Sequence, residues 1–326
     1  MSLFGPPDIA KLKEKGKTKE LIKALDYRKD AGEIQRQAVK ALAELHCPES
    51  VEPIGKLLNE LDGVNIDLSV SCAIALGALG NSSAVKHLLA ALKRTKHEAN
   101  MEELLELKRT LSLQKTGFDY KLAEKLAKDW IKARYNYMQY VRVLAAQALG
   151  KIGATEAISM LGDTLKDDNP VVARYATDAL ARIGGPDALK ALLSPLHGKD
   201  VKVRRLAARA LAQMNIPEAR EQLRFIASDK DEIIRDYAES SSAAGDWKPS
   251  RIELVNELLE LLNFHTDINI YHTICELTPK KQIDQKAISE NAVKDSVEIL
   301  TQKYHIADQK EIDEILRIAI EKKDHS

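Results

Sequence analysis

The sequence predicts an all-α fold, an αα-superhelix of stacked helix pairs, and three observations support this class. Glycine and proline are sparse, with 15 and 10 among 326 residues, as expected for helices joined by short turns. Alternating runs rich in Val, Ile and Thr are missing, so strands are not expected. The chain also repeats itself every 31 residues, which indicates units that bury their apolar faces against their neighbours. The repeating positions include Ala145, Ala176, Ala207 and Ala238; Leu149, Leu180 and Leu211; and Asn169, Asp200 and Asp231.

Composition narrows the class of protein. Charge is balanced, with 49 basic and 49 acidic residues, so no global polyelectrolyte character points to nucleic acid or a membrane. Three cysteines without a CxxC pair, Cys47, Cys72 and Cys275, indicate reduced thiols. No apolar run reaches the roughly 20 residues that span a bilayer, and Met1–Phe4 lacks a signal core. We therefore expect a soluble, cytoplasmic protein with no membrane contact.

The chain divides in order into a leader, a repeat array and a divergent end. Residues 1–17 predict a leader helix that opens after Pro6 and Pro7. Six repeats then occupy residues 18–246, each built from two helices. Several second helices end in a glycine, which favours the left-handed conformation of a helix C-cap. These glycines are Gly80, Gly153 and Gly184.

Two stretches carry a family resemblance. The sequence VRVLAAQALGKIG at Val141–Gly153 resembles the second helix of HEAT-like repeats of the short, phycobilisome-lyase type, and VRRLAARAL at Val203–Leu211 matches it again. The likeness covers residues 18–246 and is strongest in repeats three to five. It implies a HEAT-like solenoid and, across the family, mostly protein–protein interaction. It is not specific for one activity.

An arginine recurs at one repeat position, as Arg142, Arg204 and Arg235. One interpretation is a basic ladder that binds phosphates. The other is structural, with each arginine satisfying carboxylates and turn carbonyls near Asp200 or Asp231. We favour the structural role, because the resemblance implies that this arginine is a consensus feature.

The third repeat is interrupted. About 42 residues beyond the repeat period lie between Leu92 and Val141. Their helical spacing predicts an inserted helical hairpin at about 93–140, whose first helix carries Met101–Leu111. Neither Gly nor Pro occurs from Asp119 to Leu149, so we expect the second inserted helix to continue into the repeat helix. Insertions in repeat proteins often map to the binding face.

The insertion contains the candidate interaction residues. It holds 6 of the 15 aromatic residues within 23 positions, and the segment Lys86–Arg142 around it has a net charge of +6. Aromatic residues and arginine dominate binding hot spots, and they also suit single-stranded nucleic acid. The alternative is that Trp130 and Tyr137 fill the core of the hairpin. The predicted interaction residues are Phe118, Tyr120, Trp130, Arg134, Tyr135, Tyr137, Tyr140 and Arg142.

Residues 247–326 lose the repeat and carry a net charge of −4. We expect a divergent C-terminal helical cap, because exposed ends of solenoids need covering; a separate partner-binding domain is the alternative. Ser250 is placed to cap a first helix carrying Leu254–Leu262. Further helices are expected at about Ile268–Leu277, Ile283–Tyr304 and Asp308–Lys322.

Motifs for chemistry are sparse. His265, His272 and Cys275 lack the fourth ligand that a structural zinc site needs. His97-Glu98 is a single pair, whereas HEAT-like di-iron hydroxylases carry several. No P-loop, GxSxG, HExxH or Gly-rich dinucleotide turn occurs. We therefore predict no catalytic residue, cofactor or metal.

These observations predict a non-enzymatic scaffold or adaptor that binds a protein partner on the inner surface of the solenoid and on the inserted hairpin. Nucleic-acid binding through the basic, aromatic insertion is the first alternative. A bilin lyase-like or chaperone role is the second, suggested only by the repeat subtype. The identity of the partner and the oligomeric state stay open.

Overall fold

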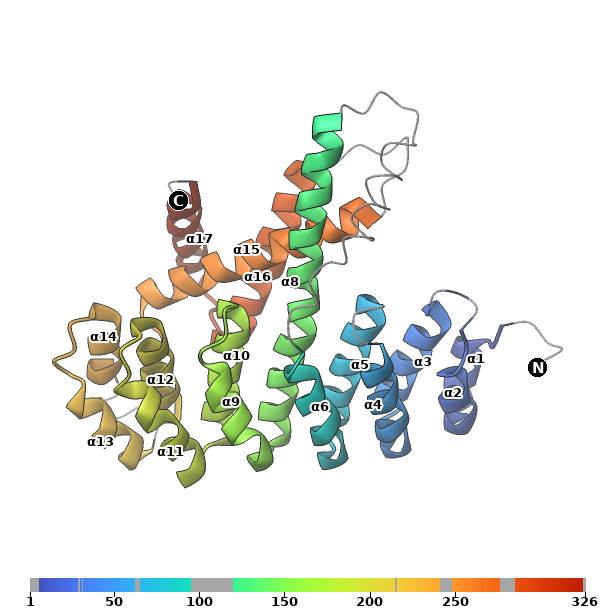
Figure 1. Ribbon diagram of the computed structural model, residues 1–326, viewed down its shortest axis with the longest axis horizontal. Coiled ribbons are helices and arrows are strands. Elements are labelled where there is room, and N and C mark those ends of the chain that lie inside the picture. The colour runs from blue at the N-terminus through green and yellow to red at the C-terminus, as the bar shows by residue number, and fades with distance from the viewer. Residues whose placement is uncertain are drawn as a thin grey trace. The chain divides into compact units, whose positions relative to one another are not determined.

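The computed structural model describes residues 6–28, 30, 32–61, 65–94, 120–214, 216–240, 248–275 and 285–324. Within these ranges all regular elements are helices (Figure 1). The predicted all-α superhelix is confirmed. The chain forms two compact units: unit 1 comprises Met1–Thr95 and Gln139–Ala244, and unit 2 comprises Lys96–Met138 and Gly245–Ser326.

Unit 1 is an array of helix pairs in two layers. After α1 (Ile9–Glu14), the first helices of the pairs are α2 (Thr18–Ala24), α4 (Val51–Glu60), α6 (Val85–Leu92), α9 (Ile158–Thr164), α11 (Gly185–Leu196) and α13 (Pro217–Phe225). The second helices are α3 (Glu33–Glu44), α5 (Ile66–Leu79), the C-terminal part of α8 (Tyr120–Ile152), α10 (Pro170–Ile183), α12 (Val201–Met214) and α14 (Glu232–Ser240). Single 3₁₀ turns, η1 (Pro48–Ser50), η2 (Ser82–Ala84) and η3 (Thr155–Ala157), lead into α4, α6 and α9. Second helices pack on second helices, as α3 does on α5 and α10 on α12, and first helices on first helices, as α4 does on α6 (Figure 1).

The recurring Asn and Asp residues cap the second helices. Asn169 Oδ1 accepts hydrogen bonds from the backbone N–H groups of Val171 and Val172, at 3.0 and 3.2 Å. Asp200 accepts from Lys202 N at 2.8 Å, and Asp231 accepts from Ile234 N at 3.2 Å. A side-chain acceptor here satisfies N–H groups that have no partner within the helix. The period of this row is therefore the period of helix starts.

Glycine ends several second helices, as predicted. The φ angles of Gly80, Gly153 and Gly184 are 63°, 71° and 65°. An L side chain rarely adopts this region, so glycine is the residue that ends the helix there without strain.

The core of unit 1 follows the leucine row of the second helices. Leu42, Leu76, Leu149, Leu180 and Leu211 are fully buried. Small residues beside this row allow neighbouring second helices to approach closely. A Cβ atom at Gly77 would lie 3.0 Å from Ala148 Cβ, and one at Gly150 would lie 2.8 Å from Ala179 Cα. The close contacts between α5 and α8, and between α8 and α10, are therefore possible only because Gly77 and Gly150 have no side chain.

The inserted segment contributes to unit 2. Its second helix continues into the repeat as the single helix α8, Tyr120–Ile152, which confirms the predicted continuity. The expected first hairpin helix, carrying Met101–Leu111, lies outside the described residues. The residues of α8 before Gln139 belong to unit 2, and those from Gln139 onward belong to unit 1.

The rest of unit 2 consists of α15 (Arg251–Cys275), α16 (Gln285–Tyr304) and α17 (Gln309–Asp324). Ser250 Oγ accepts from Glu253 N at 3.4 Å and caps α15, as predicted. The apolar core joins all three helices through Leu254, Val255, Leu258 and Leu262 of α15, Leu300 of α16, and Ile315 and Ala319 of α17. Coverage of an array end by residues 247–326 stays a prediction.

One expectation for unit 2 was wrong. The sequence predicted separate helices around Leu254–Leu262 and Ile268–Leu277, but α15 continues from the first range into the second without a break and is described as far as Cys275. Residues between them have weak helix propensity. Phe264, His265, Asp267 and Ile268 are nevertheless all buried, so packing continues along the helix and overrides that local preference. Among the described residues, no helix is long and apolar enough to cross a membrane.

Close packing at Gly150 gives a direct test. We expect Gly150→Ala to lower the free energy of unfolding by about 1–3 kcal/mol, because the new methyl group would meet the backbone of α10. Gly162→Ala is the matched control, since the nearest atom, Ala191 Cβ, lies 3.7 Å away. There the better helix propensity of alanine should leave stability unchanged or raise it by up to about 1 kcal/mol. Urea unfolding measures both; equal stabilities of the two variants would contradict the packing argument.

Candidate interaction surfaces

The predicted interaction residues lie around the N-terminal and middle parts of α8. Phe118 lies outside the described residues. Tyr120 and Trp130 are in α8, but their side chains also lie outside the described part of the chain. Five of the eight residues can therefore be placed: Arg134, Tyr135, Tyr137, Tyr140 and Arg142.

Within unit 2, α8 packs against α15. Tyr137 is 5% exposed, and its ring lies 4.7 Å from the ring of His272 in an edge-on arrangement. Asn136, the residue before Tyr137, donates through Nδ2 to Asp267 Oδ2 at 2.5 Å. One turn earlier on α8, Lys132 Nζ lies 3.4 Å from Asp267 Oδ1. Tyr137 is thus a core residue of unit 2, and its partner belongs to the C-terminal segment.

Three of the predicted residues keep part of their surface accessible. Arg134, Tyr135 and Tyr140 are each half-buried. They form the described portion of the predicted interaction surface that solvent still reaches. Their role in binding stays a prediction.

Arg142 links three parts of unit 1. Its Nε donates to the carbonyl of Leu92 at 2.9 Å, where α6 ends, and its Nη1 donates to Gln139 Oε1 at 2.8 Å. Its Nη2 lies 2.5 Å from Asp167 Oδ2, in the loop before α10. Only 12% of the Arg142 side chain is exposed. Because charge-assisted hydrogen bonds are strong, these contacts fix the third repeat to the fourth.

The equivalent arginines are arranged in the same way. Arg204 donates to the carbonyls of Gly198 and Lys199 in its own repeat, at 3.2 and 3.0 Å, and contacts Asp229 of the next repeat at 3.2 Å. Arg235 donates to the carbonyls of Asp229 and Lys230. These contacts match the structural interpretation of the arginine row.

Asp167 and Asp229 stand two repeat steps apart, as do their partners Arg142 and Arg204. In the repeat between them, Ala173 occupies the arginine position and Gly198 the aspartate position. Across these three repeats, arginine and aspartate are therefore both present or both absent.

Another ion pair joins two identical repeat positions. Asp178 of α10 and Arg209 of α12 are 31 residues apart, and Arg209 Nη2 lies 3.0 Å from Asp178 Oδ1. The Arg209 side chain is 1% exposed, and Gln213 Nε2 also donates to Asp178 at 3.2 Å. Sequence reasoning missed this pair. The sequence feature that could have predicted it is an acidic residue followed by a basic residue one repeat later, at the same position of the second helix.

The same repeat position is exposed in earlier repeats. It carries Lys40 in α3, Ile74 in α5 and Gln147 in α8, all of which are exposed. Ile74 is the unusual member, with 52% of its surface accessible. One turn further along each helix, Glu44, Ala78, Lys151 and Arg182 form a second exposed row. The two rows give the second helices a solvent-facing surface of mixed chemistry.

The first-helix layer contains a buried histidine. His87 of α6 is 5% exposed; its Nδ1 lies 2.9 Å from Asn59 Nδ2, and its Nε2 lies 3.1 Å from Glu52 Oε2. Hydrogen bonds from Lys86 and His87 lower the pKa of Glu52 to about 2. A Cβ at Gly55 would lie 2.2 Å from the His87 ring, so this glycine makes room for the imidazole. Each ring nitrogen has a partner within the array, which suits a structural histidine.

Unit 2 also uses its polar groups internally. Glu257 of α15 is 1% exposed, and Lys303 Nζ and Tyr304 Oη of α16 both lie 2.6 Å from its carboxylate oxygens. His265 is 7% exposed; desolvation lowers its pKa, and the charge of Asp295 partly opposes that effect.

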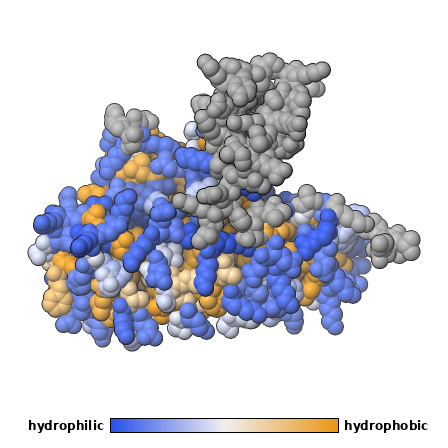
Figure 2. Space-filling view, viewed as in Figure 1, coloured by the Kyte–Doolittle hydropathy of each residue, from blue (hydrophilic) through white to orange (hydrophobic). Residues whose placement is uncertain are grey.

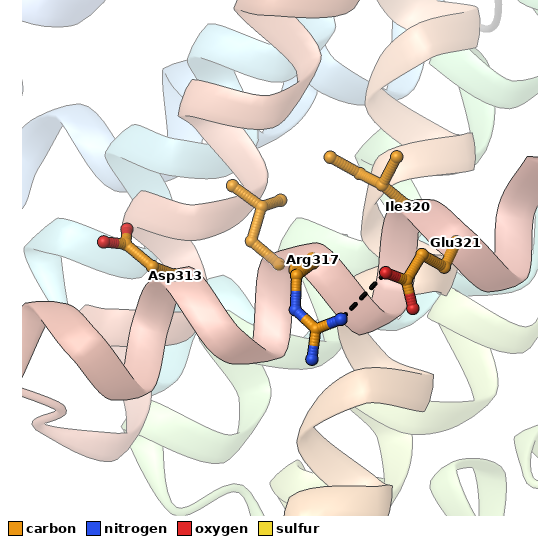
Figure 3. A pocket seen from close by; sticks show the side chains of 5 residues that line it. Asp313, Arg317, Ile320 and Glu321 are labelled. Atoms are coloured by element: carbon orange, nitrogen blue, oxygen red, sulfur yellow. Dashed lines mark hydrogen bonds and ion pairs between the residues drawn. The ribbon is translucent and has the colours of Figure 1, made fainter.

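Figure 3 shows an open hollow along one side of α17. Its lining comes from this helix alone: Asp313, Leu316, Arg317, Ile320 and Glu321. Arg317 and Glu321 form an ion pair at 2.9 Å across one helical turn. An open hollow lined by a single helix does not enclose a small molecule in the way that ligand sites do.

Residues that could hold a metal ion do not converge in the described part of the chain. No three His, Cys, Asp or Glu residues there are placed to hold a metal ion. Cys47 and Cys72 are buried free thiols, and burial raises the pKa of Cys72 to about 12, which favours the unreactive protonated form.

Two family models match the repeat array. The model for HEAT repeats matches residues 128–199. The model for the PBS lyase HEAT-like repeat matches residues 34–60, 70–94 and 203–229. The chain is a HEAT-like repeat protein. The matched segments include α3 with α4, α5 with α6, and α12 with α13, so they span the packing rows described above.

Three solved structures resemble this HEAT-like repeat protein at low identity. The complex of CpcE and CpcF of phycocyanin lyase from Nostoc sp. PCC7120 is 19% identical, with a TM-score of 0.34, and the match covers 88% of this chain and 85% of the other. Human deoxyhypusine hydroxylase is 16% identical, with a TM-score of 0.29, over 72% and 98% of the two chains. An engineered protein is 20% identical, with a TM-score of 0.26, over 98% and 91%. A search of the curated proteins found no match.

The Arg142–Asp167 pair can be tested by a double-mutant cycle. We expect Arg142→Met to lower the free energy of unfolding by about 1.5–3 kcal/mol, because it leaves partly buried acceptors unpaired. Combined with Asp167→Asn, it should show a coupling energy of about 0.5–3 kcal/mol. The control cycle uses Arg36 and Glu33, an ion pair whose side chains are 51% and 47% exposed; its coupling should be smaller, about 0.2–1 kcal/mol or less. Additive effects of Arg142→Met and Asp167→Asn would contradict the linking role.

His265 predicts a pH dependence. Burial holds the pKa of His265 in the folded state below its ordinary value of 6.5, so the folded state binds the proton less readily than the unfolded chain. Its contribution to stability is therefore constant above about pH 6.5 and becomes unfavourable as the pH falls through that value. We expect His265→Gln to reduce the loss of stability between pH 7.5 and pH 5.5, measured by denaturant midpoints. The exposed His197→Gln should leave the pH profile unchanged, and an unchanged profile for His265→Gln would refute the assignment.

Proposed function

We propose that this HEAT-like repeat protein is a non-enzymatic scaffold or adaptor that binds a protein partner on the exposed surface of its second helices. One observation carries the proposal. Positions that pack between repeats are occupied by the same small or apolar residues along the array, whereas the exposed positions on α3, α5 and α8 carry Lys40, Ile74 and Gln147. Uniform packing with a varied exposed surface provides a rigid framework whose specificity lies in the exposed side chains.

The polar clusters support a binding role over a chemical one. Arg142, Arg204 and Arg209 bind carboxylates or carbonyls within the array, and His87 is held by two neighbouring side chains. Groups used in this way hold the repeats together. Half-buried Arg134, Tyr135 and Tyr140 on α8 are proposed as a second contact region.

Site-specific photo-crosslinking tests the proposal. We place benzoylphenylalanine at Gln147 on the second helices, and at Lys190, an exposed residue of the first helix α11, as the control. In extracts of the source cell, Gln147 should cross-link to a discrete protein and Lys190 should not. If neither position captures a protein, the scaffold role is refuted.

Nucleic-acid binding is the competing outcome. The affinity of the full chain for single-stranded and duplex DNA and RNA is measured at two salt concentrations. A protein scaffold should show weak binding or none. Tight binding whose affinity falls steeply with salt would favour the nucleic-acid function instead.

A further inference from the structure

The exposed side of α5 differs from that of the other second helices. Val70, Ile74 and Ala78 follow one another at four-residue steps along one side; Val70 is buried, whereas Ile74 is 52% exposed and Ala78 is also exposed. Asp67 is the only charged residue in α5, which spans Ile66–Leu79. A helix that is apolar all round normally has both sides covered. In unit 1, α5 keeps one apolar side open to solvent.

Basic residues flank this apolar side on the neighbouring helices. Lys40 occupies the position of Ile74 in the preceding repeat, and Lys151 occupies the position of Ala78 in the next described second helix. Arg182 follows one repeat later, and all three basic residues are exposed. No ion pair with a described residue holds any of them. We call the set of Lys40, Ile74, Ala78, Lys151 and Arg182 the Ile74 surface.

Two carboxylates on the same helices have partners of their own. Glu44 forms an ion pair with Lys13, and this contact, together with the nearby charge of Lys40, lowers its pKa. Asp178 is held by the buried guanidinium of Arg209 and by Gln213. Glu44 and Asp178 therefore have their closest contacts with other side chains, and Lys40, Lys151 and Arg182 are exposed, with Lys40 near enough to Glu44 to act on its pKa.

We propose that the Ile74 surface docks an acidic peptide segment of a partner protein. This inference rests on the proposed scaffold function and names the chemistry of its partner. An apolar side chain of the peptide covers Ile74 and Ala78, and carboxylates before and after it approach the three basic residues. This arrangement gives the apolar centre and charged rim of an interface. The basic rim favours a partner segment of negative charge.

The probe is a displayed library of random peptides, selected against the full-length chain. We expect the enriched peptides to share one apolar residue flanked by Asp or Glu. A synthetic peptide with this consensus should bind more weakly as salt rises, because its flanking charges are screened. Enrichment of neutral or basic peptides, or no enrichment, overturns the proposal.

Two variants locate the site and one controls for exposure. Ile74→Gln introduces the residue that stands at the equivalent position in α8, and it should weaken peptide binding about tenfold or more. Lys151→Glu should weaken binding and flatten its salt dependence. Phe225→Gln removes a side chain that is 67% exposed on α13 of the first-helix layer, and it should leave binding unchanged. Retained binding by Ile74→Gln overturns the proposal even if acidic peptides are enriched.

The outcomes separate the inference from the function on which it rests. A protein cross-link at Gln147 without acidic peptide binding leaves the scaffold function standing and refutes the chemistry of the partner. Self-association that Ile74→Gln abolishes, measured by sedimentation velocity, would assign the surface to a second copy of the chain and refute the acidic partner. Capture of no protein at all refutes both.

Discussion

Close approach between neighbouring second helices is the constraint on which the rest of unit 1 depends. Helices can pack at short axial distances only where their facing residues are small. At Gly150 a single added methyl group would lie 2.8 Å from the backbone of α10. Because this contact recurs along the array, the small residues determine the distance between repeats. The leucine row beside them fills the space that remains, and its members are fully buried.

Polar contacts then fix the repeats in register. Apolar packing alone is non-directional, so it does not prevent one helix pair from sliding along the next. Arg142 and Arg204 add direction, because each binds carbonyls in its own repeat and a carboxylate in the following one. Asn169, Asp200 and Asp231 mark where α10, α12 and α14 begin. Polar groups committed to these tasks hold the repeats together.

The sequence was sufficient to predict the array because its packing rules are local and repeat at a fixed interval. Alanine rows, leucine rows and terminal glycines each leave a period that can be read without coordinates. The continuity of α8 was equally predictable, because neither glycine nor proline interrupts it. The contact of Tyr137 with His272 was not predictable, since the two residues are distant in the chain and share no period. Propensity also failed for α15, where buried residues carry the helix through a weak segment.

Exposed positions carry different residues in successive repeats, so their role could not be predicted from a period. Aromatic enrichment drew attention to α8, yet Tyr137 is buried in unit 2 and Arg142 is committed to a structural network. Ile74 drew none, because a single isoleucine in an apolar helix looks like one more core residue. Its difference emerges only when equivalent positions are compared across the folded array, where Lys40 and Gln147 show that this side of α3 and α8 faces solvent. Residues that recur at the repeat interval are the ones that pack between repeats. An apolar residue that departs from the pattern at an exposed position is a candidate for binding a partner. Ile74 is such a residue, and the exposed basic residues on the neighbouring helices indicate an acidic partner.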